Sequence, residues 1–215
     1  MKLAVFDLDG TLVDSRRDLA EAANDLLTAC GGTPLAEEAV GRLVGDGAAV
    51  LVARVFAAAR CDAPPDALVR FLDLYNGRLL RFTRPYPGIV EALEAIGSRA
   101  TLAVLTNKPA SATRHILEGL DLARFFPSQY VRGGDGPLPR KPDPAGLRAL
   151  MAETGIPARE TTLVGDSLVD WRTALAAGTR ACLARYGFGF EGFPLDQLRP
   201  DDVIVDDAAE LPVRL

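Results

Sequence analysis

Short apolar runs that end at polar or glycine-rich turns recur along the chain, and their length is typical of buried strands. They lie at residues 3–6, 102–105, 163–164, 181–184 and 203–205. Helical patterns about as long as a crossover helix separate the later runs, at residues 88–96, 110–120, 144–154 and 168–177. Because strands and helices alternate, the pattern predicts an α/β fold with a doubly wound, mostly parallel sheet covered by helices on both faces.

Residues 15–84 break this alternation, because they are rich in Ala, Leu and Arg at helical spacing and contain no convincing strand. Glycine or proline interrupts the helical pattern at residues 30–34, 45–47 and 62–65. We therefore predict an all-helical domain at residues 15–84, inserted into an α/β core that comprises residues 1–14 and 85–215.

Two acids, Asp7 and Asp9, directly follow the first apolar run. In extended backbone they point to the same side, and Gly10 then permits a tight turn. Parallel sheets bind ligands at the carboxyl ends of their strands, where a divalent cation relieves the repulsion between paired carboxylates. A surface turn is the alternative reading. An EF-hand calcium loop is excluded, because Leu12 and Asp18 stand where it needs Gly and Glu.

Three later segments carry polar groups at matching places. Thr106 and Asn107 end the second run, where a hydroxyl and an amide suit a phosphoryl oxygen but also serve as a plain helix cap. Lys141 lies among prolines that restrict its backbone. Asp166 and Asp170 follow the strand at residues 163–164 with helical spacing, which fits metal binding and helix capping equally well. Taken together, these groups can converge on one cation and one phosphate.

Composition narrows the function classes. Hydrophobic residues at 48% and charged residues at 25% are ordinary for a globular protein, and a net charge of -5 argues against a surface for nucleic acid. No run reaches the roughly 18 apolar residues of a membrane span, and acids interrupt the start of the chain before a signal peptide could form. The three cysteines lie too far apart for a zinc motif. We expect a soluble cytoplasmic protein.

The four polar segments, in this order, resemble the motifs of the haloacid dehalogenase superfamily, which also carries a helical cap directly after the first motif. Asp7-Leu-Asp-Gly-Thr is similar to the first motif and Gly165-Asp-Ser-Leu-Val-Asp170 to the last. Three segments resemble phosphoglycolate phosphatases in particular: Asp-Gly-Thr-Leu-Val-Asp-Ser15, Leu-Thr-Asn-Lys-Pro109 and Arg-Lys-Pro-Asp-Pro144. The resemblance covers essentially the whole chain and implies a Rossmann-like haloacid dehalogenase core.

By that resemblance Asp7 is a nucleophile that becomes an aspartyl phosphate, and Asp9 is the general acid and base. Dehalogenases of the superfamily lack the second acid, so its presence favours phosphoryl transfer. The resemblance also implies Mg²⁺, held by the side chains of Asp7 and Asp166 and by the backbone carbonyl of Asp9. Asp170 would support this site or bind the metal itself.

The resemblance further implies that Thr106, Asn107, Lys141 and Gly10 hold the phosphoryl oxygens, with Lys141 also counted as catalytic. His115 is expected to be structural.

In the helical insertion, Gly41-Arg-Leu-Val-Gly-Asp-Gly47 resembles the substrate-facing segment of phosphoglycolate phosphatases, although a plain helix-to-helix turn explains it equally well. Arg42, Gly45 and Gly47 are therefore candidate specificity residues, and Arg42 could meet a substrate carboxylate.

We expect an enzyme that hydrolyses a small phosphorylated metabolite, with 2-phosphoglycolate as the favoured substrate. Two alternatives remain: a phosphomutase of the β-phosphoglucomutase type, and a non-catalytic module that senses phosphate or metal. The sequence leaves monomer and homodimer equally open.

Overall fold

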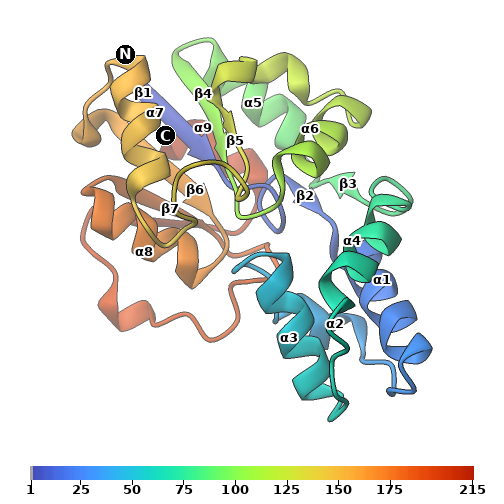
Figure 1. Cartoon of the computed structure of the whole chain (residues 1–215). Coiled ribbons are helices and arrows are strands. Elements are labelled where there is room, and N and C mark those ends of the chain that lie inside the picture. Colours follow the sequence, from blue (N-terminus) through green and yellow to red (C-terminus); the bar gives the residue numbers. More distant parts are fainter. Residues whose placement is uncertain (1) are drawn as a thin grey trace.

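The computed structural model describes residues 2–215, so residue 1 of the predicted core lies outside the described residues. Within this range a parallel sheet has the strand order β5-β4-β1-β6-β7-β8 (Figure 1). Its strands are β1 (Lys2–Phe6), β4 (Ala100–Leu105), β5 (Val131–Arg132), β6 (Thr161–Gly165), β7 (Arg180–Ala184) and β8 (Val203–Val205). The chain builds outward from β1 first on one side and then on the other, which confirms the doubly wound α/β fold.

Helices cover both faces of the sheet, and successive residues of each strand point to opposite faces. Phe6 and Val104 pack in one apolar cluster with α5 (Ile89–Gly97) and α6 (Ala110–Gly119). Val5 and Leu105 pack in the other with α7 (Ala145–Thr154) and α8 (Leu168–Ala177). The short helix α9 (Leu211–Arg214) closes the end of the chain against α5. Because both faces are buried, the strands read as unbroken apolar runs in the sequence.

The predicted strands all coincide with observed ones, but three two-residue strands were not predicted. One is β5, at the edge of the sheet. The others are β2 (Val13–Asp14) and β3 (Arg84–Pro85), which pair antiparallel where the chain leaves the sheet and returns to it. Two residues carry no periodic signal, and Pro85 argues against a strand in a sequence, which is why the pattern missed them.

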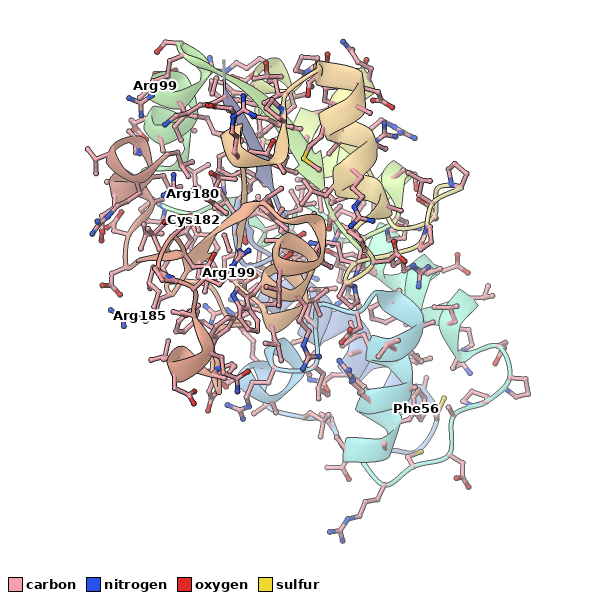
Figure 2. All side chains as sticks on the ribbon, turned by 90° about the vertical axis from the view of Figure 1, so that its left-hand side faces the viewer. Phe56, Arg99, Arg180, Cys182, Arg185 and Arg199 are labelled. Atoms are coloured by element: carbon pink, nitrogen blue, oxygen red, sulfur yellow. The ribbon has the colours of Figure 1, made fainter. Side chains whose placement is uncertain are left out.

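The helices α1 (Arg16–Ala29), α2 (Glu37–Gly41), α3 (Ala48–Ala58) and α4 (Ala67–Asn76) follow one another between β2 and β3. They lie together beside the sheet (Figure 1), and Figure 2 labels Phe56 on α3 well away from Cys182 on β7. Buried Asp18 of α1 accepts hydrogen bonds from the backbone N–H groups of Phe82 and Thr83 and from the Thr83 hydroxyl, the last two at 2.7 Å each. This acid therefore fixes the end of the helical segment to its start.

Arginine pairs brace the C-terminal part of the core. Arg185 binds Asp206 at 2.7 Å and Arg199 binds Asp202 at 2.7 Å, and both arginines are labelled in Figure 2. These pairs flank a loop at residues 186–193, in which the Gly189 N–H donates to Asp166, the residue after β6, at 2.7 Å. Across residues 2–215, no helix is both long and apolar enough to span a membrane.

Candidate active site

The carboxyl ends of three adjacent strands bring the first candidate residues together. Strand β1 lies between β4 and β6 and runs parallel to both, so Phe6 pairs with Val104 and with Val164. The residues that follow, Asp7, Thr106 and Asp166, consequently meet at one edge of the sheet and line a common pocket. This is the edge at which parallel sheets bind ligands.

An acidic cluster forms the floor of the site. One carboxylate oxygen each from Asp7, Asp166 and Asp170 lies within 4.8 Å of the others, and all three residues are buried. Lys141 stands under the cluster, with its ammonium 2.8 Å from Oδ1 of Asp7 and donating to Oδ1 of Asp170 at 2.6 Å. Among residues 2–215, this lysine is the one cation in contact with the three acids, so the floor carries excess negative charge.

Burial and the excess negative charge both raise the pKa values of two of these acids, Asp7 and Asp166. Burial raises the pKa of Asp7 to about 6, with Lys141 opposing the effect and Asp170 adding to it. Burial also raises the pKa of Asp166 well above its ordinary value, and the charges of Asp170 and Asp7 raise it further. Such shifts favour the protonated forms of the two carboxyl groups, and a bound cation would favour their ionised forms instead.

The geometry around the acids suits an oxygen-bound cation. The Oδ1 atom of Asp7 is buried, and its close contact in the described chain is the Lys141 ammonium at 2.8 Å. A Cβ at Gly10 would fall 1.9 Å from Oδ2 of Asp166, and one at Gly187 would fall 2.2 Å from the Gly10 carbonyl oxygen. Glycines thus allow the backbone to pack closely around the Asp166 carboxylate, and the ligand atoms that the cluster offers are all oxygens, as Mg²⁺ and Ca²⁺ prefer.

Asp170 both caps a helix and joins the site. Its Oδ2 accepts from the N–H and the hydroxyl of Ser167, at 3.1 and 2.6 Å, in a capping box at the start of α8. Its Oδ1 accepts from Lys141. A Cβ at Gly165 would lie 2.2 Å from Cγ of Asp170, so this approach requires glycine. The predicted helix cap is therefore confirmed, and the same carboxylate is part of the acidic cluster.

Two candidate phosphate ligands are engaged elsewhere. The Asn107 amide donates to the carbonyl oxygens of Lys141 and Gly45, both at 2.9 Å, and its Oδ1 accepts from the Lys141 N–H. It therefore fixes the Lys141 backbone and joins the core to the helical segment. The Gly10 N–H donates to the Val13 carbonyl at 2.9 Å, and the missing Cβ of this glycine lets the Asp166 carboxylate approach its backbone. Thr106 lines the pocket directly.

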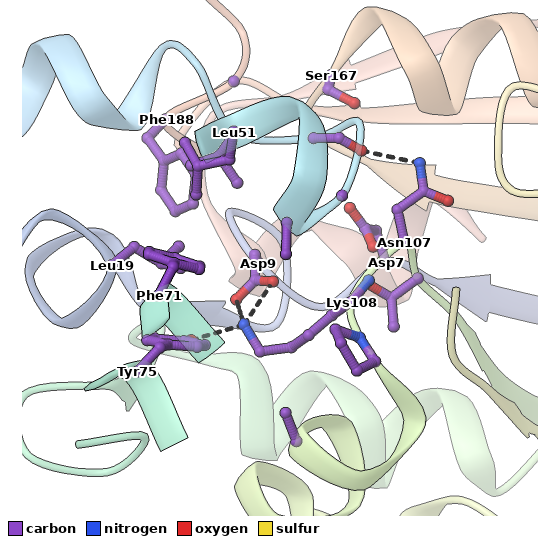
Figure 3. A pocket seen from close by; sticks show the side chains of 18 of the residues that line it. Asp7, Asp9, Leu19, Leu51, Phe71, Tyr75, Asn107, Lys108, Ser167 and Phe188 are labelled. Carbon is purple, nitrogen blue, oxygen red and sulfur yellow. Dashed lines mark hydrogen bonds and ion pairs between the residues drawn. The ribbon is translucent and has the colours of Figure 1, made fainter. Parts of the chain in front are cut away.

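Asp9 is held by residues to which the sequence analysis gave no role. Its two oxygens accept from Lys108 at 2.9 Å each, and the Ser15 hydroxyl donates to it at 2.5 Å. Lys108 also donates to the Tyr75 hydroxyl of α4 at 2.6 Å (Figure 3). Burial lowers the pKa of Lys108, but the charges and hydrogen bonds of Asp9 and Tyr75 together outweigh burial and raise the pKa above its ordinary value.

Two of these partners stand in segments that carry the family resemblance. Ser15 ends the first segment, and Lys108 lies two residues beyond Thr106 in the Thr-Asn-Lys-Pro109 segment. Tyr75 lies on the apolar side of a helix and reads there as a core residue.

Two of the three specificity candidates of the helical segment line the pocket, and the third does not. Gly45 and Gly47, with φ of 128° and 92°, line the pocket. Arg42 instead lies on the exposed surface, where it pairs with Glu191 at 3.1 Å. His115 is exposed on α6, away from the pocket.

Comparison with known proteins gives a consistent family. The family model described as "Haloacid dehalogenase-like hydrolase" matches residues 4–184. The phosphoglycolate phosphatase of Rhodospirillum rubrum is 45% identical over 88% of this chain and 82% of its own, and that of Agrobacterium fabrum is 37% identical over 98% and 91%. The crystal structure of a predicted phosphoglycolate phosphatase from Haemophilus somnus 129pt superposes with a TM-score of 0.88 at 32% identity, covering 98% of this chain and 96% of that one.

Proposed function

This chain belongs to the haloacid dehalogenase-like hydrolases, and on that basis we propose that it is a magnesium-dependent phosphoric monoester hydrolase that converts 2-phosphoglycolate into glycolate and phosphate. The observation that carries the proposal is the buried Asp7, which sits between a lysine and two further acids with Asp9 two residues along. The names of the similar phosphatases support the choice of substrate.

The metal would be held by oxygen atoms of the acidic cluster. Asp7 and Asp166 would supply carboxylates and Asp9 its backbone carbonyl. Asp170 supports the site from behind, because it is bound by the Lys141 ammonium and by Ser167, whereas the Asp166 oxygens accept from neutral donors, the Gly189 N–H at 2.7 Å and the Thr11 hydroxyl at 3.4 Å. When bound, Mg²⁺ would neutralise negative charge on the acids and on the transferring phosphoryl group.

Two carboxylates would perform the chemistry. An Asp7 oxygen attacks phosphorus and forms an aspartyl phosphate as the bond from phosphorus to the ester oxygen breaks, and Asp9 gives its proton to the departing alkoxide. Asp9 then accepts a proton from the water that hydrolyses the aspartyl phosphate. The Lys141 ammonium, 2.8 Å from Asp7, offsets the charge that gathers on the phosphoryl oxygens, and Thr106 offers a hydroxyl to the same oxygens.

We further propose that residues 15–84 act as a cap over this site. The pocket takes its roof from this segment, including Leu51 and Phe71, and its floor from the strand ends. A cap that closes on the substrate excludes water from the reacting bonds, and its opening releases the product.

The test is a panel of phosphate monoesters assayed with Mg²⁺, ranked by kcat/KM, for the natural chain and for Asp7→Asn. We expect 2-phosphoglycolate to rank first and Asp7→Asn to abolish turnover, while Asp73→Asn, which alters an exposed carboxylate on α4, retains it. Mg²⁺-dependent hydrolysis by Asp7→Asn would disprove the role of Asp7. Another top substrate would disprove the narrow assignment alone. Isomerisation of a hexose 1-phosphate without phosphate release would instead identify a mutase.

A further inference from the structure

The pocket between the helical segment and the strand ends is small and mostly apolar. Leu19, Leu51, Phe71 and Phe188 line it on the same side of the acids (Figure 3). The space open to water-sized groups is about 50 Å³, which holds only a few such groups. In this arrangement of the chain the pocket suits a ligand of a few heavy atoms beyond its phosphate.

Lys108 is the only basic residue among the pocket-lining residues of the described chain. The Lys141 ammonium is already engaged by Asp7 and Asp170. Arg42 points to the surface and pairs with Glu191. If a second anionic group of the substrate is bound by a cation in this pocket, that cation is Lys108.

The partners of Lys108 form a polar subsite in an apolar surrounding. Its side chain is 4% exposed and its three ammonium protons match three acceptors, the two oxygens of Asp9 and the Tyr75 hydroxyl. The Tyr75 hydroxyl accepts from Lys108 and keeps its own proton to donate. A lysine and a hydroxyl so arranged suit a carboxylate.

When Asp9 acts as the proton donor, the Lys108 ammonium loses its anionic partner. To give a proton to the ester oxygen, Asp9 has to leave the ammonium that now binds both of its oxygens. An ammonium this deeply buried is costly without an anionic partner. A substrate carboxylate can take the place of Asp9, and the exchange keeps Lys108 paired throughout.

We propose that Lys108 and the Tyr75 hydroxyl bind the carboxylate of the substrate, which displaces Asp9 from Lys108 and frees it to act on the ester oxygen. The inference rests on the proposed function, because it assigns Asp9 its proton-carrying role. Lys108 touches Asp9, which neighbours the nucleophile in the chain, so the substrate is a short phosphorylated acid whose carboxylate stands close to the phosphate ester.

The experiment compares two substrates in each variant with Mg²⁺ present: 2-phosphoglycolate, and 2-hydroxyethyl phosphate, which has an alcohol in place of the carboxylate. Lys108→Met should lower the ratio of their kcat/KM values roughly 10- to 100-fold, the value of a hydrogen-bonded charge. If Lys108 merely positioned Asp9, both substrates would suffer equally and the ratio would stay unchanged, which overturns the inference.

Two further variants keep the result decisive. Tyr75→Phe preserves the buried ring and should lower the same ratio roughly 3- to 10-fold, so it decides the matter if Lys108→Met does not fold. Arg42→Met should leave the ratio unchanged, and a fall there with none in the other two variants would transfer the subsite to Arg42. Equal use of both substrates by the natural chain would refute a carboxylate subsite while leaving the phosphatase intact. Hydrolysis of neither substrate nor any other monoester would refute the proposed function itself.

Discussion

Replacing Asp7 by Asn should make the stability of the metal-free protein less dependent on pH. In the folded chain burial raises the pKa of Asp7 from 3.8 to about 6, against the pull of Lys141. In the unfolded chain the same carboxyl is in water and keeps its ordinary pKa. Folding therefore disfavours the ionised form of Asp7. The substitution replaces the Asp7 carboxyl with an amide, which neither gains nor loses a proton in this pH range.

The sign and size follow from proton linkage. Between pH 3.8 and about 6 the unfolded chain has released the Asp7 proton while the folded chain still holds it, so the free energy of unfolding falls as pH rises through this window. The total fall is about 3 kcal/mol, and about 2 kcal/mol of it lies between pH 4.5 and 7.5. Above the folded pKa the penalty is constant, and below 3.8 it is absent.

The assay is urea denaturation in EDTA at several pH values, for the natural chain, Asp7→Asn and the exposed control Asp73→Asn. The free energy of unfolding of Asp7→Asn relative to the natural chain should increase by about 2 kcal/mol from pH 4.5 to 7.5. Any effect of the substitution that does not depend on pH cancels in this difference. Parallel pH profiles for the natural chain and Asp7→Asn would refute the account of a destabilised, buried carboxylate.

Three further outcomes test other parts of the structure. Asp9→Asn should lower kcat/KM, which reports formation of the aspartyl phosphate and not its hydrolysis, about 10²- to 10⁴-fold for an alkyl phosphate. The loss should be much smaller for p-nitrophenyl phosphate, whose leaving group needs no proton; steady-state kinetics that give an equal loss of kcat/KM for both esters would contradict the role of Asp9 as the acid. Gly10→Ala should lower the free energy of unfolding by at least about 2 kcal/mol more than Gly31→Ala does. Both glycines have positive φ, but only a Cβ at Gly10 would meet a carboxylate. Urea denaturation of the two variants measures this difference. Asp18→Ala should cost about 3 kcal/mol in the same assay, since the donors of residues 82–83 lose their buried acceptor, and a cost below about 1 kcal/mol would contradict that role.

The sequence predicted the fold because buried parallel strands leave a plain signal. Each apolar run of the core ends at a polar residue, and parallel strands carry their carboxyl ends to one edge. From this it followed that Asp7, Thr106 and Asp166 could meet. The strand order was not predictable in the same way, since the pairing of β1 with β6 joins residues far apart in the chain and depends on the packing of the whole core.

The surroundings of Asp9 were beyond the sequence for a different reason. Lys108 and Tyr75 meet only because α4 lies over the strand ends, and that placement depends on how the helical segment packs. Tyr75 on an apolar helix side is indistinguishable from a core residue until its hydroxyl is located. Arg42 is the opposite case. The sequence made it a candidate substrate ligand, but in the structure it pairs with Glu191, which lies on a loop that sequence patterns cannot place.

The charges of the assembled site imply an order of binding. Four carboxylates, those of Asp7, Asp9, Asp166 and Asp170, face two ammonium groups, those of Lys108 and Lys141, so the fully ionised site carries a net charge of two negatives. An incoming phosphate monoester is itself an anion and would be repelled. A bound divalent cation would cancel that net charge and would oppose the rise in the pKa of Asp7 and Asp166, so the repulsion of the substrate would be relieved and the ionised nucleophile favoured in the same event. The metal is therefore expected to bind before the substrate. Lys108 would then pair with the substrate carboxylate, and Lys141 would offset the charge on the phosphoryl oxygens.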